Sequence, residues 1–176
     1  MRKISLIAIT MVVFATSAFA LVSALNWQIK ENAYSVKFST SRAEGVIKGL
    51  VGSIEFDEKN LSVSNFDVTV DVTSLNTGNG LKNRHAKGEK FLNASKYPII
   101  HFKSSQITQN STGYIAKGKL TIKDISQDVS IPFTFSKTGN EAVFSGDFVI
   151  NRKDFKLDFK GIGEVIRIEL LIPVSK

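Results

Sequence analysis

The chain contains no cysteine among its 176 residues. It therefore cannot form a disulfide framework or carry a lipidated N-terminal cysteine after export, and its stability must come from an ordinary hydrophobic core. It also has no internal repeat, no low-complexity segment and no linker-like stretch. These absences indicate one domain that folds without disulfide bonds.

Histidine is nearly absent too, with only His85 and His101 in the chain. A metal site needs three or four ligands, and there is no HExxH motif or acidic cluster of metal-site spacing. Glu89 would share a helical face with His85, while His101 lies in a strand pattern in which its apolar neighbours point the other way. We expect capping or hydrogen-bonding histidines, with no metal site and no cofactor.

Catalytic signatures are missing as well. Serine and threonine are abundant, but none lies in a GxSxG elbow, and a base for a nucleophile would have to be one of the two histidines. Asp67 and Asp71 fall on the outer, wet face of a strand pattern. We therefore assign no catalytic residue and do not expect an enzyme.

One long hydrophobic run is present, at the N-terminus. Residues 1–3 are positively charged, residues 4–14 are almost entirely apolar, and residues 18–20 place small side chains where a signal peptidase cleaves. A retained membrane anchor would need about 20 apolar residues, and three hydroxyl residues interrupt this run. We expect residues 1–20 to be a cleaved signal peptide and residues 21–176 to form the domain, periplasmic or secreted, without stable membrane insertion.

The formal charge of +7 falls to +5 when Arg2 and Lys3 leave with the signal peptide. Nucleic-acid-binding proteins concentrate such charge on one face, together with stacking aromatics or a recognition helix. Neither pattern is visible, and lysine on outer strand faces discourages edge-to-edge aggregation. We do not expect a nucleic-acid partner. An attraction to anionic envelope surfaces stays open, and so does the oligomeric state, with a homodimer as one option.

After Trp27 the hydrophobic period is two almost everywhere, which indicates strands with one buried face. In residues 64–72, for example, apolar side chains alternate with Asp67, Thr69 and Asp71. The same alternation predicts further strands within residues 27–29, 33–39, 46–56, 98–104, 113–124, 128–136, 142–151 and 164–172. The chain is therefore all-β, with eight or nine antiparallel strands.

Such strands can form a two-sheet sandwich or a closed barrel. Removing the signal peptide leaves eleven of the 13 phenylalanines, most of them at inward positions. Glycines at 49, 52, 118 and 146 fall within strand patterns, where they permit bends or leave room. Both features favour an eight-stranded antiparallel barrel over the sandwich.

The two-residue period lapses between Thr73 and Tyr97. Gly and Asn residues predict a loop, followed by one or two turns of amphipathic helix, so we expect a short helical segment near residues 78–95. Leu81, His85 and Phe91 or Leu92 would lean on the barrel like a lid across one mouth. The basic side chains would lie largely in water: Lys82, Arg84, Lys87 and Lys90.

The same stretch resembles the signature of the YceI-like family, through SLNTG at residues 74–78, His85, FLN at 91–93 and YPIIHF at 97–102. Three further pieces fit in the right order: WQIKENAYSVKFS, GKLTIKDISQDVSIPFTF and INRKDF. Members usually have acidic residues where this chain has Asn83 and Lys90, and a glycine where it has Lys156. We expect these differences to lie at the barrel mouth rather than in its lining.

The resemblance implies a lipocalin-like barrel that carries a polyisoprenoid chain, such as an isoprenoid quinone or its precursors. The chain would be held by burial of its methylene groups, each contributing about 0.8 kcal/mol. Headgroup contacts at the mouth are expected from Asn83, Arg84 and His85. The interior contacts are expected from Phe66, Val68, Val70, Phe102, Leu120, Ile122, Phe133, Phe135, Phe144 and Phe148.

Three alternatives stay open at this stage. The inward side chains could pack on one another and leave a solid barrel whose outer face is functional. An enzyme could use His85 with Glu89 or Asn83 on a bound lipid. A partner-binding envelope protein could use the basic loop from Lys82 to Lys90, and would then associate with anionic surfaces in a salt-sensitive way.

Overall fold

The computed structural model describes residues 25–158 and 163–176, so the predicted signal peptide at residues 1–20 lies outside the described part. The described residues form nine strands, one α-helix and two short 3-10 helices. In chain order these elements are β1 (Asn26–Ile29), β2 (Ser35–Ser39), β3 (Glu44–Glu55), η1 (Leu61–Val63), β4 (Asn65–Asn76), α1 (Gly80–Lys87), β5 (Ile99–Asn110), β6 (Gly113–Ile122), β7 (Ile125–Thr138), β8 (Glu141–Asn151), η2 (Arg152–Phe155) and β9 (Val165–Ser175).

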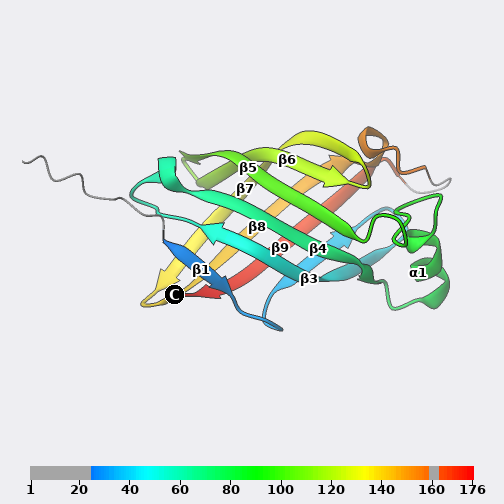
Figure 1. Ribbon diagram of the computed structural model, residues 1–176, viewed down its shortest axis with the longest axis horizontal. Coiled ribbons are helices and arrows are strands. Elements are labelled where there is room, and N and C mark those ends of the chain that lie inside the picture. The colour runs from blue at the N-terminus through cyan, green and yellow to red at the C-terminus, as the bar shows by residue number, and fades with distance from the viewer. Residues whose placement is uncertain (1–24, 159–162) are drawn as a thin grey trace, which may run out of the picture.

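The strands close into an antiparallel barrel with eight positions (Figure 1). From β4 to β9 each strand pairs with the next, and β3 closes the ring by pairing with both β4 and β2. The short strands β1 and β2 share one position, because both lie between β3 and β9. The predicted eight-stranded barrel is confirmed, and the alternative of a sandwich is wrong.

The barrel has two different ends (Figure 1). At one, here called the α1 end, lie the β2–β3 turn, α1 with the loop that follows it, and η2. At the other, the β1 end, lie β1, η1 and the last strand residues before the C-terminus. The two ends differ in both packing and charge.

Glycines occupy strand positions where the neighbouring backbone passes very close. Gly52 has a φ of +132°, and a Cβ there would lie 2.1 Å from the carbonyl oxygen of Asp67. A Cβ at Gly118 would lie 2.2 Å from the carbonyl oxygen of Lys103, next to a register shift in β5. No side chain fits such close backbone approaches, which explains glycine inside these strands.

Aromatic rings fill the β1 end. The Phe56 ring lies at the centre, 4.8 to 6.2 Å from its neighbours measured between ring centroids. Edge-on and tilted pairs of this kind add about 0.5–1.5 kcal/mol each beyond burial. The buried Trp27 indole donates to the carbonyl oxygen of Phe56 at 3.0 Å. The other rings of this aromatic cluster are those of Phe66, Tyr114, Phe133, Phe135 and Phe144.

The predicted helix is present as α1, Gly80–Lys87, and it covers only part of the segment near residues 78–95 in which it was expected. Asn79 caps α1 by accepting from the backbone N–H groups of Leu81 and Lys82. Leu81 was expected to lean on the barrel and instead is 54% exposed, because it lies in the first turn, on the outward face. The chain then folds back under the helix, and Leu92 supplies the buried contact, at 5% exposure.

Candidate functional site: an apolar cavity at the α1 end

A cavity of about 180 Å³ occupies the half of the barrel next to α1. All eight strand positions contribute to its wall, which is aliphatic apart from a few phenylalanines. Among the described residues that line it, only Thr40 and Thr69 carry a polar side chain. The strand residues that line it include Val36, Phe38, Ile47, Leu50, Val68, Val70, Ile100, Phe102, Leu120, Ile122, Ile131, Phe148, Ile150, Ile166, Ile168, Leu170 and Ile172.

The cap over this cavity comes from α1 and the loop after it. Ala86, Phe91 and Leu92 face the cavity. Two lysines on the helix hold it to the rim: the Lys82 Nζ donates to the carbonyl oxygen of Arg42 at 2.9 Å, and the Lys87 Nζ donates to that of Thr73 at 2.5 Å. The cap is thus attached mainly by surface hydrogen bonds and a few apolar contacts, features of a region of low local stability.

A buried arginine in η2 holds a second segment over the cavity, which is counted with the cap from here on. Arg152 is 8% exposed, and its guanidinium donates to the carbonyl oxygens of Gly163 at 3.0 Å and Leu157 at 2.6 Å. These bonds hold Leu157, which is 1% exposed, against the cavity. Sequence reasoning missed Arg152, although a charged residue directly after a buried strand within INRKDF was a usable signal. A buried charge needs such partners.

Six of the ten predicted interior residues line the cavity: Val68, Val70, Phe102, Leu120, Ile122 and Phe148. Phe66, Phe133 and Phe144 instead border a smaller space of about 70 Å³ deeper in the barrel. Phe135 lies 5.4 Å from Trp27 in the aromatic cluster and lines neither space. The alternation of the strands identified the inward face but not which end is hollow. Contact with a ligand stays a prediction for all ten.

The three predicted mouth residues lie on α1, outside the cavity lining. Asn83 serves the loop, since its Oδ1 accepts from the N–H and the Oγ1 of Thr77, both at 2.8 Å, and its Nδ2 donates to Asn76. Arg84 and His85 are exposed. Their role toward a headgroup stays a prediction. The positions that depart from the family pattern, Asn83, Lys90 and Lys156, also lie outside the lining.

The second histidine belongs to a charged cluster on the outer wall. His101 Nε2 lies 2.7 Å from one carboxylate oxygen of Asp67, and Lys103 Nζ lies 2.8 Å from the other. These bonds, that of Lys103 first, hold the pKa of Asp67 below its ordinary value, while partial burial opposes the shift. The cluster lies on the outside of the same wall, because its side chains alternate with Val68 and Phe102, which line the cavity. It is an ion-pair network on the barrel surface.

Within residues 25–158 and 163–176, no three His, Asp or Glu side chains lie close enough together to hold a metal ion. In the same ranges, no helix is both long enough and apolar enough to cross a membrane.

Known proteins support the assignment of fold and family. A solved structure titled Burkholderia cenocepacia BcnA superposes with a TM-score of 0.78 at 25% identity, covering 85% of this chain and all of that one. A domain from Saccharophagus degradans described as polyisoprenoid-binding matches with a TM-score of 0.62 at 11% identity, covering 85% of this chain and 97% of its own, a likeness of fold.

In sequence, a UPF0312 protein of Yersinia pestis is 27% identical over 139 residues, or 76% of this chain and 69% of the relative. The model of the YceI-like domain matches residues 27–174, which include every strand from β2 to β8 and most of β1 and β9. The predicted resemblance is thereby confirmed: the chain belongs to the YceI-like family.

Proposed function

We propose that this protein is an exported lipid-binding protein, which holds an apolar chain of polyisoprenoid or isoprenoid-quinone type in its barrel for transport, storage or stress protection. The observation that carries the proposal is the cavity beneath α1, with its nearly complete hydrocarbon wall. The polyisoprenoid-binding description of the Saccharophagus degradans domain, whose fold is alike, supports the choice of ligand.

The driving force would be the removal of methylene groups from water, about 0.8 kcal/mol each, or about 4 kcal/mol for a five-carbon isoprene unit. Ordering a flexible chain offsets part of this. The cavity of about 180 Å³ compares with an engineered apolar cavity of about 150 Å³ that takes up benzene. In this conformation it therefore holds a short hydrocarbon segment, and a longer chain requires the cap to move outward.

The direction of entry follows from the two ends of the barrel. The aromatic cluster fills the β1 end, so the chain enters at the α1 end. The cavity wall offers almost no hydrogen-bonding groups, and a buried polar group without partners is costly. The polar headgroup therefore stays at the rim, near α1.

Binding without catalysis is part of the proposal. No titratable side chain lines the cavity, so no general acid or base of the described chain faces the buried part of a ligand. The isoprenoid is thus cargo and not a cofactor. A periplasmic or secreted location rests on the N-terminal sequence alone, and one copy of the chain suffices because the cavity is complete within one barrel.

The test is uptake of defined ligands by lipid-free protein comprising residues 21–176, measured by native mass spectrometry with a polyprenol and an isoprenoid quinone. We expect one-to-one complexes. Ala86→Leu, which places a larger side chain in the cavity, should lower uptake strongly, whereas Val149→Leu on the exposed wall should not. Equal uptake by both variants, or none by the unaltered protein, would contradict the proposal.

A further inference from the structure

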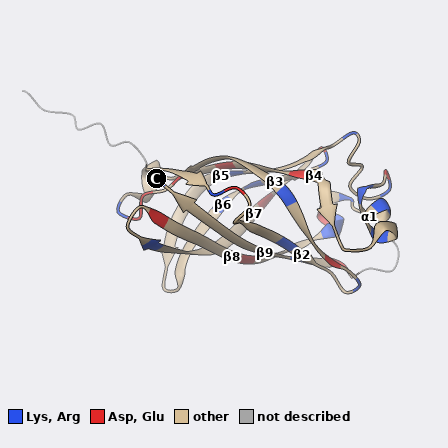
Figure 2. Cartoon of the chain, turned by 90° about the horizontal axis from the view of Figure 1, so that it is seen from below, with Lys and Arg blue, Asp and Glu red and all other residues tan. Residues whose placement is uncertain are grey.

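The basic side chains of this protein are distributed unevenly. The α1 segment, defined as residues 80–96, carries five of them and one acidic residue, Glu89. Figure 2 shows the blue of lysine and arginine on α1. Among the described residues none of these five forms an ion pair with a carboxylate, because every ion pair found there uses another cation. The five are Lys82, Arg84, Lys87, Lys90 and Lys96.

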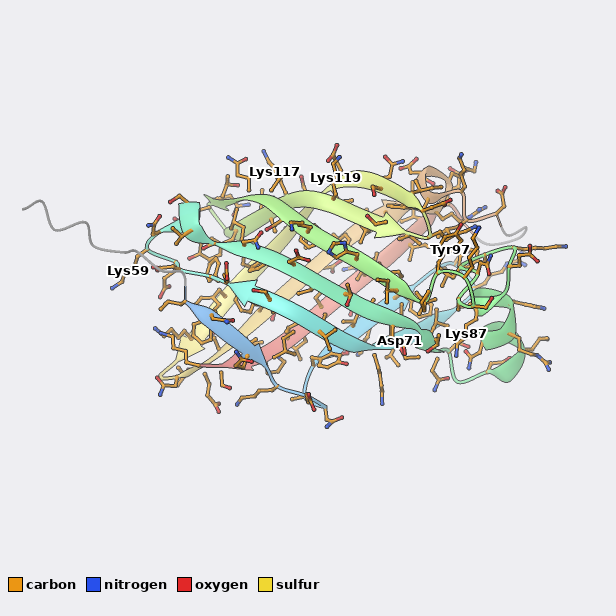
Figure 3. All side chains as sticks on the ribbon, viewed as in Figure 1. Lys59, Asp71, Lys87, Tyr97, Lys117 and Lys119 are labelled. Carbon is orange, nitrogen blue, oxygen red and sulfur yellow. The ribbon has the colours of Figure 1, made fainter. Side chains whose placement is uncertain are left out.

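The barrel wall contrasts with this segment. Lys103 pairs with Asp67 at 2.8 Å, and Lys119 pairs with Asp128 at 3.0 Å. At the β1 end the loop from β3 to β4 contains Asp57 and Glu58 with a single lysine. Figure 3 shows that lysine, Lys59, at the opposite end of the barrel from Lys87. The α1 segment therefore adds a net charge of +4 beside the cavity mouth, of which, within the described residues, only Lys96 is partly offset by a carboxylate, that of Asp124 in the turn between β6 and β7.

Exposed apolar side chains occur at the same end. Leu81 on α1 is 54% exposed and has Lys82 and Arg84 close by on the helix. Ile99 and Val165 are 53% and 54% exposed and begin β5 and β9, both of which start at the α1 end. A cationic surface with protruding apolar side chains is the composition that binds the interface of an anionic bilayer.

From this arrangement we propose that the α1 end docks reversibly on the surface of an anionic lipid bilayer, with Leu81 in the interface and the α1 segment over the headgroups. The inference rests on the proposed function, because docking places the cavity mouth against the membrane from which a lipid is taken or to which it is given. Basic side chains spread over residues 82–96 fit an extended anionic surface better than a single headgroup.

Each basic residue near an anionic surface is expected to raise the partition coefficient about fivefold. Three neutralisations should therefore lower binding about 100-fold, and raised salt should weaken the binding of the unaltered protein. A few charges and one leucine give weak attachment, which a carrier needs in order to leave the membrane again.

The experiment measures co-sedimentation of lipid-free protein, residues 21–176, with vesicles of phosphatidylglycerol and phosphatidylcholine, and with vesicles of phosphatidylcholine alone. The test variant is Arg84→Gln, Lys90→Gln and Lys96→Gln together. A control of the same net charge is Lys59→Gln, Lys117→Gln and Lys137→Gln, three exposed lysines away from the α1 end. We expect binding to the anionic vesicles only, lost in the test variant and changed less than about threefold in the control.

The chain has no cysteine, so a single one can report the orientation. An environment-sensitive dye on Leu81→Cys should shift to the blue on anionic vesicles, while the same dye on Val51→Cys, 60% exposed on the wall, should not. Equal losses in the two triple variants would overturn the proposal. So would equal binding to heparin without a shift at position 81, because the partner would then be a polyanion and not a bilayer.

Cargo loading is followed separately by native mass spectrometry of the same variants. Vesicle binding with no cargo uptake would refute the proposed function and leave the docking surface standing. Cargo uptake without vesicle binding would refute the docking surface alone.

Discussion

Replacing Ala86 by leucine tests directly whether the α1 half of the barrel is hollow. Ala86 lies on α1 and faces the cavity. Leucine adds three carbon atoms, and their burial in empty space is worth about 2 kcal/mol. Leucine is nearly as good a helix former as alanine, which leaves most of this gain. We expect lipid-free Ala86→Leu to be more stable than the unaltered protein by about 1–2 kcal/mol, with a Tm about 3–6 °C higher.

The matched control is the same substitution in the filled half of the barrel. Ala142 is 4% exposed in β8 and lines no part of the cavity. Added carbon atoms in a packed core force side chains out of position, so Ala142→Leu should lose about 1–3 kcal/mol. Urea unfolding of both lipid-free variants measures the difference. If Ala86→Leu is destabilised as much as Ala142→Leu, the α1 half is packed and the reasoning about a ligand cavity is refuted.

Three further predictions concern the cap, the outer wall and the aromatic cluster. Arg152→Met removes the donors to Gly163 and Leu157. Leaving the buried Leu157 carbonyl without a partner costs about 1–3 kcal/mol, and cargo should dissociate faster in an exchange assay. The pKa of Asp67 is lowered in the folded state, so its ion pairs stabilise the protein above the unfolded pKa of about 3.9 and are lost as pH falls through the folded pKa. Asp67→Asn should therefore make the free energy of unfolding in urea less dependent on pH below about 4. The same pH dependence in the variant and the unaltered protein would contradict this. Phe56→Ala should cost about 3–5 kcal/mol in urea unfolding without altering the cavity, since five other rings pack on Phe56 at the β1 end.

The sequence predicted the barrel well because alternation is a local signal. Every second residue of β4, from Phe66 to Val72, faces inward, and the turn-like segments separate the strands as expected. The closure of β3 on β4 depends on bends at Gly49 and Gly52, whose positions inside a strand pattern were already visible. These features depend on neighbours in the chain, so a single sequence contains them.

The location of the cavity could not be predicted in the same way. Phe135 and Phe148 look alike in an alternating strand, yet one packs on Trp27 and the other lines the cavity. The difference depends on how far along the barrel each strand places its rings, which is set by register across many strands. The polar contacts of the cap were hidden for the same reason. Once the loops have folded, Asn83 forms hydrogen bonds with Thr77 and Asn76, and Arg152 forms them with two backbone carbonyls.

The measurement that decides most about the cavity is native mass spectrometry of the protein purified from the cells that produce it, followed by organic extraction of whatever is bound. We expect a stoichiometric apolar adduct of isoprenoid type, released by unfolding and reduced in Ala86→Leu. A bare polypeptide mass, unchanged after incubation with polyprenols and quinones, would contradict it and direct attention to the outer surface of the barrel.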